Sequence, residues 1–135
     1  MEIESLIEEL KTTEDADRRN ELALGLSEMH SDEAVPVLIE LIKKLRWTDD
    51  YGQLIYALNN LNCANELTGI LDIIFHGDLE ACNNLLLLFK KKYPEMDAEH
   101  KAECRRIFEY EAERAQDNLE TIDNIMDTVI DRIDN

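Results

Sequence analysis

Apolar positions recur along this chain at a spacing that predicts helices and a structural repeat. Two sets of eight apolar or small residues lie 32 residues apart and in the same order. The first set is Leu22, Gly25, Leu26, Met29, Val35, Leu38, Ile39 and Ile42, and the second is Leu54, Ala57, Leu58, Leu61, Leu67, Ile70, Leu71 and Ile74. Intervals of three and four residues are typical of one face of an α-helix. The pattern therefore predicts two stacked helix-turn-helix units.

The same intervals predict further helices on either side of the repeat. We expect helices at about residues 2–11, 16–29, 33–45, 50–60, 65–75 and 78–91. Thr13 or Asp15 is placed to cap the second of these helices, and Ser31 or Asp32 the third, which has Pro36 in its first turn. The run Leu85 to Phe89 is apolar on all sides, which predicts a helix surrounded by neighbours. Residues 97–134 contain no Gly or Pro, and we expect two helices there, separated near 116–118, rather than one long helix.

Composition agrees with an all-α fold in one domain, residues 1–135. The chain has only four Gly and two Pro, and 44% of its residues are hydrophobic, enough to bury one core. No run of eighteen apolar residues exists, and the first eleven residues lack the basic leader of a signal peptide.

Residues 22–44 resemble a HEAT-like repeat. Their second helix matches the motif EAVPxLIExL through Glu33, Ala34, Val35, Pro36, Leu38, Ile39, Glu40 and Leu41, and Arg18 and Arg19 precede the unit. The second copy departs from the motif, with Thr68 in place of the proline, and a third pair over about 78–109 keeps only the helical period. The resemblance implies a right-handed α-solenoid of about three helix pairs plus a terminal helix. HEAT arrays serve as scaffolds, chaperones, transport receptors and inhibitors alike, so the resemblance does not indicate an activity.

Charge narrows the choice of partner. There are 31 acidic and 14 basic side chains, for a net charge of −17. Residues 1–17 have a net charge of −6 and residues 109–135 of −7, whereas residues 18–108 are nearly balanced at −4. Such a surface repels nucleic acid and attracts basic proteins. In size, helical type and charge the chain is also similar to immunity proteins of bacterial polymorphic or contact-dependent toxin systems.

Two segments are candidates for contact with a partner. The loop RWTDDYG, residues 46–52, combines aromatic and acidic side chains, and Trp or Tyr there can anchor an interface. The alternative for Trp47 is that it folds back over the first unit. The last helix has an acidic stripe with few basic residues to balance it, although such a stripe is also what a solvated helix face looks like. The predicted partner-binding residues are Trp47, Asp49, Asp50, Tyr51, Asp72, Asp78, Glu80, Glu120, Asp123 and Asp127.

Residues that could support catalysis or bind a metal are few. His100 and Cys104 lie one helical turn apart but supply at most half of a zinc site. Cys63, Cys82 and Cys104 form no CxxC pair and are expected to be small core residues, as suits a reducing cytoplasm. Acidic pairs such as Asp49 with Asp50 arise by chance in so acidic a chain. We therefore expect no enzyme activity, cofactor or metal.

Taken together, these features predict a cytoplasmic, acidic protein-binding module, a monomer or weak dimer when free, with no direct contact to nucleic acid or membrane. The most concrete form is an immunity protein that neutralises a basic toxin such as a nuclease. The alternatives are a HEAT-repeat scaffold or adaptor in a larger complex, or a DNA-mimic protein.

Overall fold

A computed structural model describes residues 2–45, 51–76 and 79–114, and the structural statements below refer to these ranges. The α-helices are α1 (Ile3–Thr12), α2 (Ala16–Glu28), α3 (Val35–Leu45), α4 (Gly52–Ala57), α5 (Ile73–His76), α6 (Leu79–Lys92) and α7 (Ala98–Arg114). The short 3₁₀ helices are η1 (Asp32–Ala34), η2 (Leu58–Asn60), η3 (Ala64–Gly69) and η4 (Tyr93–Glu95). No strand occurs in these ranges, so the described chain is all-α, as predicted.

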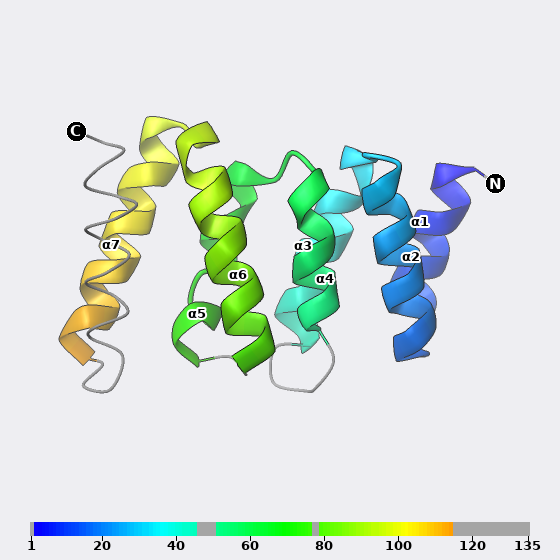
Figure 1. Ribbon diagram of the computed structural model, residues 1–135, viewed down its shortest axis with the longest axis horizontal. Helices are drawn as coiled ribbons and strands as arrows, with labels where there is room; N and C mark the ends of the chain where they lie inside the picture. The colour runs from blue at the N-terminus through cyan, green and yellow to red at the C-terminus, as the bar shows by residue number, and fades with distance from the viewer. Residues whose placement is uncertain (1, 46–50, 77–78, 115–135) are drawn as a thin grey trace.

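The helices stand side by side in a row and form two layers (Figure 1). Helices α2, α4 and α6 pack against one another in sequence and make the layer nearer the viewer. In the second layer α1 contacts α3, α3 contacts η3, and η3 contacts α7. Each layer therefore takes one helix from each successive unit of the chain. None of the described helices is both long enough and apolar enough to cross a membrane.

The core lies between the two layers and is built from the repeated apolar positions. Every residue of the two sets is buried except Gly25, which is half-buried, and Met29, which is exposed. Near α7 the core is completed by aromatic rings, with Phe108 5.4 Å from Phe75 and 5.3 Å from Phe89 between ring centroids. The prediction that the repeat marks the inward face of each helix is confirmed for these residues.

Hydrogen bonds join equivalent corners of successive units. The backbone N–H of Asn62 donates to Asp32 Oδ1 at 2.8 Å, across 30 residues of sequence. One unit further on, the N–H of Asp97 donates to Asn65 Oδ1 at 3.2 Å, across 32 residues. In the other layer Lys91 Nζ donates to the carbonyl of Asn59 at 3.0 Å, again 32 residues away. The period seen in the apolar pattern thus reappears as a period in polar contacts between units.

The end of α2 shows how a corner is made. Asp15 caps the start of this helix by accepting hydrogen bonds from Asp17 N and Arg18 N. At its other end His30 adopts a left-handed conformation, φ 53°, and Ser31 N donates to Leu26 O at 3.1 Å. This is the Schellman arrangement that ends many helices. It reverses the chain within two residues.

The structure differs from the expected elements in two places. The helix predicted at 65–75 is instead η3 followed by α5, and η3 ends at Gly69, a weak helix former. Leu87 is 65% exposed although Leu85 and Leu88 are fully buried, so the prediction of a helix covered on all sides is wrong. Helix α7 confirms a helix after residue 97, and the predicted break at 116–118 lies outside the described residues.

Candidate functional site

Most of the predicted partner-binding residues lie outside the described part of the chain. These are Trp47, Asp49, Asp50, Asp78, Glu120, Asp123 and Asp127. The structure describes the other three, namely Tyr51, Asp72 and Glu80. They do not form one surface, as the following contacts show.

Tyr51 belongs to the core and not to an exposed interface. Its side chain is 1% exposed, and its backbone carbonyl accepts hydrogen bonds from Leu54 N and Ile55 N at the start of α4. Because α4 lies between α2 and α6, a ring at its first turn is enclosed. The prediction that Tyr51 is an exposed anchor is therefore corrected. The aromatic residue that α4 does expose is Tyr56, at 55%.

Glu80 lies in the first turn of α6, against the start of α4. Gln53 Nε2 donates to Glu80 Oε1 at 3.4 Å, and Asn84 Nδ2 donates to the carbonyl of Gly52 at 3.0 Å. A Cβ atom at Gly52 would lie 2.5 Å from Glu80 Oε1, so the glycine is what lets the carboxylate come so close. Glu80 is exposed, and it helps to hold α4 and α6 together.

Asp72 faces α7. It lines a hollow of about 480 Å³ between η3 and α7, together with Thr68, Glu103, Arg106, Ile107, Tyr110 and Glu111. Glu111 is only 8% exposed and approaches His76 Nε2 to 3.3 Å. Glu103 is paired with Arg106 on the same helix. Glu103 and Glu111 of this hollow thus each have a partner within the protein.

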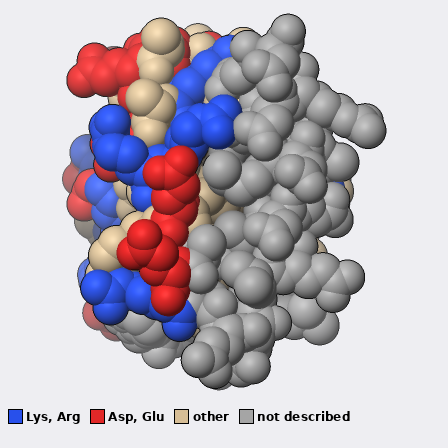
Figure 2. Space-filling view, turned by 90° about the vertical axis from the view of Figure 1, so that its left-hand side faces the viewer, with Lys and Arg blue, Asp and Glu red and all other residues tan. Residues whose placement is uncertain are grey.

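The α7 end of the row has mixed charge. Figure 2, which faces this end, shows Lys and Arg side chains interleaved with Asp and Glu. A shallow groove of about 410 Å³ along α7 is lined by Ala98, Lys101, Ala102, Arg105, Arg106 and Glu109. The acidic excess of residues 109–135 begins at Glu109 in this groove, and the predicted acidic stripe of the last helix lies outside the described chain.

The described residues are most acidic at the opposite end of the row, in α1, α2 and η1. Residues 2–34 contain eleven acids and three bases. All the acids except Glu9 are exposed, namely Glu2, Glu4, Glu8, Glu14, Asp15, Asp17, Glu21, Glu28, Asp32 and Glu33. We call this surface the N-terminal acidic end. Its signal was present in the sequence, since residues 1–17 have a net charge of −6, but none of the predicted partner-binding residues lies there.

Few bases compensate the N-terminal acidic end. Arg18 binds Glu9 through Nε and, at 2.8 Å, through Nη2, and it approaches Glu21 to 3.0 Å. The hydrogen bond from Arg18 lowers the pKa of Glu9, so this carboxyl stays ionised. Lys11 approaches Glu8 to 3.9 Å. Within the described chain, Glu4, Glu14, Glu28 and Glu33 form no ion pair, so their charges are directed to solvent.

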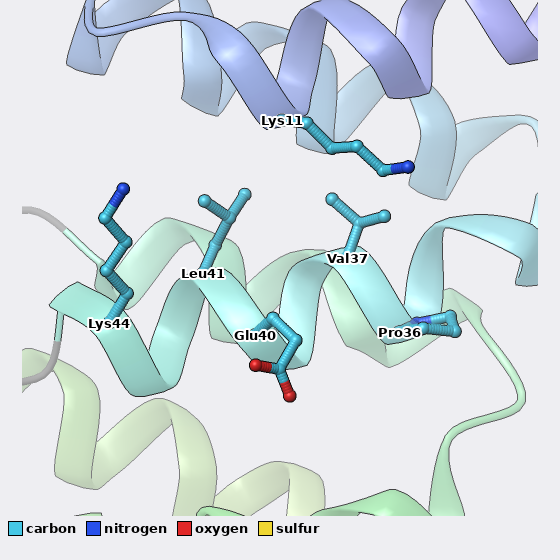
Figure 3. A pocket seen from close by; sticks show the side chains of 6 residues that line it. All are labelled: Lys11, Pro36, Val37, Glu40, Leu41 and Lys44. Carbon is cyan, nitrogen blue, oxygen red and sulfur yellow. The ribbon is translucent and has the colours of Figure 1, made fainter.

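A groove with basic sides adjoins this end. It lies between α1 and α3, has a volume of about 480 Å³, and is lined by Lys11, Pro36, Val37, Glu40, Leu41 and Lys44 (Figure 3). Figure 3 shows the apolar side chains of Val37 and Leu41 pointing toward α1, with Lys11 opposite Val37. Lys43 precedes the groove residue Lys44 in the sequence, and its Nζ lies 3.6 Å from Oε1 of Glu40.

The titratable groups of the described chain show no arrangement typical of catalysis. The lowered pKa values of Glu9 and Asp97 are explained by Arg18 and by hydrogen bonds from His100, respectively. Burial raises the pKa of the Cys63 thiol to about 11 and that of Cys104 to about 12, which leaves both uncharged. His100 Nδ1 lies 2.7 Å from Asp97, whereas Cys104 Sγ contacts Met96. Both residues thus have partners other than each other.

Comparison of the chain with models of protein families, with curated proteins and with solved structures finds no match.

Proposed function

We propose that this chain is a non-enzymatic protein-binding module that captures a basic protein through its N-terminal acidic end. Its most concrete form is an immunity protein that neutralises a basic toxin such as a nuclease, acting in a reducing compartment such as the cytoplasm. The observation that carries the proposal is the excess of exposed carboxylates on α1, α2 and η1, several of which have no ion pair among the described residues.

We propose a HEAT-like right-handed solenoid as the scaffold that presents this surface. The two layers and the corner hydrogen bonds at separations of 30 and 32 residues support the proposal. In such an array each unit is held by its neighbours, and the terminal unit has one side free for a partner. The helix backbone that carries the carboxylates is also ordered before binding, which lowers the entropy cost of the complex.

The mechanism is electrostatic capture. Exposed carboxylates attract a basic partner over distances of about one Debye length, roughly 8 Å at physiological ionic strength, and speed its association. On contact they occupy the Lys and Arg side chains that a nuclease uses for phosphate. Because the charges lie at the surface, added salt weakens the attraction. A strong dependence of affinity on ionic strength is therefore the signature of this mechanism.

The test is recovery of partners on tagged full-length protein at low salt, with identification by mass spectrometry. We expect one basic protein, released by moderate salt. The variant Glu14→Lys with Glu33→Lys reverses two exposed charges of the N-terminal acidic end, neither of which makes an ion pair within the described residues. The matched control, Glu66→Lys with Glu99→Lys, changes the net charge equally at η3 and α7.

Capture by the N-terminal acidic end predicts that the first variant weakens binding at least about tenfold more than the control. Equal losses in both variants would mean that only the net charge matters. Unchanged binding in both would place the partner elsewhere on the molecule. Recovery of a neutral multi-subunit assembly that survives high salt would replace capture by the adaptor function.

A further inference from the structure

Two large apolar side chains are exposed side by side on the layer formed by α2, α4 and α6. Tyr56 on α4 is 55% exposed and Leu87 on α6 is 65% exposed. The hydrogen bonds from Asn84 to Gly52 O and from Lys91 to Asn59 O, both 3.0 Å, align the two helices on either side of these residues. A single exposed apolar residue is ordinary, but two on adjacent helices make an apolar patch.

Exposed positions run along each helix of this layer at steps of three and four residues. On α4 they are Gln53 and Tyr56, continued by Asn60, and on α6 they are Glu80, Asn83, Leu87, Lys90 and Lys91. On α2 the equivalent positions are Glu21 and Glu28, with half-buried Leu24 and Gly25 between them. The face therefore has an acidic edge on α2, an apolar centre, and a basic end on α6.

The α2 edge also has open space at Gly25. A Cβ atom placed on Gly25 meets no atom within 4 Å, so there is open space above this residue. Leu24 beside it is half-buried. A side chain from another molecule can enter there without moving the backbone.

We propose that this face, which we call the α2–α4–α6 face, binds a second copy of the chain about a twofold axis parallel to the helices. Such an axis places α4 on α4 and α2 on α6 of the other copy, because it exchanges the two edges of the face. Glu28 then meets Lys90 and Lys91 of the second copy. Leu87 meets the open surface at Gly25, and the two Tyr56 rings meet at the centre.

The opposite charges of the two edges favour a second copy of the chain as the partner of this face. The acid of α2 and the lysines of α6 lie at the same height, since α2, α4 and α6 are offset by 30 to 32 residues and His30 Nδ1 lies 3.0 Å from the carbonyl of Asn60. A twofold axis repeats every contact, so the acidic α2 edge of each copy meets the basic end of α6 in the other copy. A purely basic partner would find Lys90 and Lys91 unfavourable, and a purely acidic one would be repelled by Glu21 and Glu28.

The expected dimer is weak. Helices of 13 and 14 residues at 1.5 Å rise and a spacing of 8–10 Å give a face of about 500 Å², below the roughly 800 Å² that each side of a stable complex buries. We therefore expect a dissociation constant in the micromolar range. Two copies of net charge −17 also repel one another, so moderate salt strengthens the dimer by screening that repulsion.

The experiment is sedimentation velocity on the full chain from about 5 to about 500 μM at moderate salt, concentrations that bracket a micromolar dissociation constant. We expect the dissociation constant to rise at least tenfold in Leu87→Ser and in Tyr56→Ser. The control Tyr110→Ser removes an aromatic side chain of similar exposure, 53%, from α7. We expect this control to leave the dissociation constant of the dimer unchanged. Circular dichroism verifies that each variant is folded.

A charge exchange tests the pairing of the two edges directly. Glu28→Lys and Lys90→Glu each place like charges opposite one another and weaken the dimer, whereas the double variant restores it. A chain that stays monomeric to the highest concentration overturns the proposal. A dimer whose dissociation constant is the same in Leu87→Ser and Tyr56→Ser as in the original chain also overturns it. If both single variants weaken the dimer and the double variant does not restore it, the pairing of α2 with α6 is rejected.

Discussion

Removing the carboxylate of Asp32 tests whether the corner hydrogen bonds hold successive units together. Asp32 Oδ1 accepts the backbone N–H of Asn62 at 2.8 Å, a charge-assisted bond between residues far apart in sequence. Bonds to charged groups contribute about 1.5–3 kcal/mol, but both residues are exposed and the freed N–H of Asn62 can bind water. Asp32 also opens η1, where a negative charge adds about 0.5 kcal/mol. We expect Asp32→Ala to lower the free energy of unfolding by about 1.5 kcal/mol.

The assay is urea unfolding followed by circular dichroism, with thermal unfolding in parallel. A loss of about 1.5 kcal/mol corresponds to a fall in Tm of roughly 3–8 °C for a chain of this size. The matched control is Glu33→Ala, which removes a neighbouring exposed acid of the same 3₁₀ turn that has no such bond, and which we expect to change stability by less than about 0.5 kcal/mol. Equal effects of the two substitutions would refute the reasoning, because the hydrogen bond between units would then contribute nothing.

Three further results are expected. His30→Val should lower the free energy of unfolding by about 1–2 kcal/mol relative to His30→Gly, since a β-branched residue is strained at φ 53°; urea titration measures the difference. At pH 8, iodoacetamide should label Cys63 and Cys104 at least roughly 100-fold more slowly in the folded chain than in urea, because their pKa values are about 11 and about 12. Asp97 accepts hydrogen bonds from His100 that lower its pKa from 3.8, so the stability lost in Asp97→Ala should be largest above that pH and shrink as pH falls below it; urea titrations across that range check this.

The sequence predicted the inward faces of the helices better than their continuity. Amphipathic spacing reports which positions are buried, and the residues of the two repeated sets in α2, α3 and α4, apart from half-buried Gly25, are accordingly in the core. The break between η3 and α5 follows Gly69, whose weak helix propensity the spacing of apolar residues does not report. The corner bonds were not predicted because they join residues 30 and 32 positions apart in the sequence. Asp32 was assigned to capping its own helix, whereas its side chain reaches the next unit.

Predictions about individual surface residues depended on which neighbour each helix has. Tyr51 lay in a polar loop sequence and was expected to be exposed, but the packing of α4 between two helices encloses it. Leu87 lay in an apolar run and was expected to be covered, but its side chain is 65% exposed. In both cases the exposure of the side chain is the opposite of what its neighbours in the sequence indicate, because it depends on how the helices of the layer pack together.

The acidic end and the apolar face are expected to respond to salt in opposite directions, and this separates the two proposals experimentally. Capture of a basic partner rests on attraction between opposite net charges, so ions weaken it. Association of two copies brings together chains of net charge −17, so ions at first strengthen it. A basic partner bound at the α1 and η1 part of the N-terminal acidic end, which leaves the α2 edge to the second copy, would itself lower the repulsion between copies. By linkage, dimer formation would then raise the affinity for that partner by the same factor. The high negative charge thus weakens the dimer of the free protein, and neutralisation of that charge by a bound basic partner strengthens it.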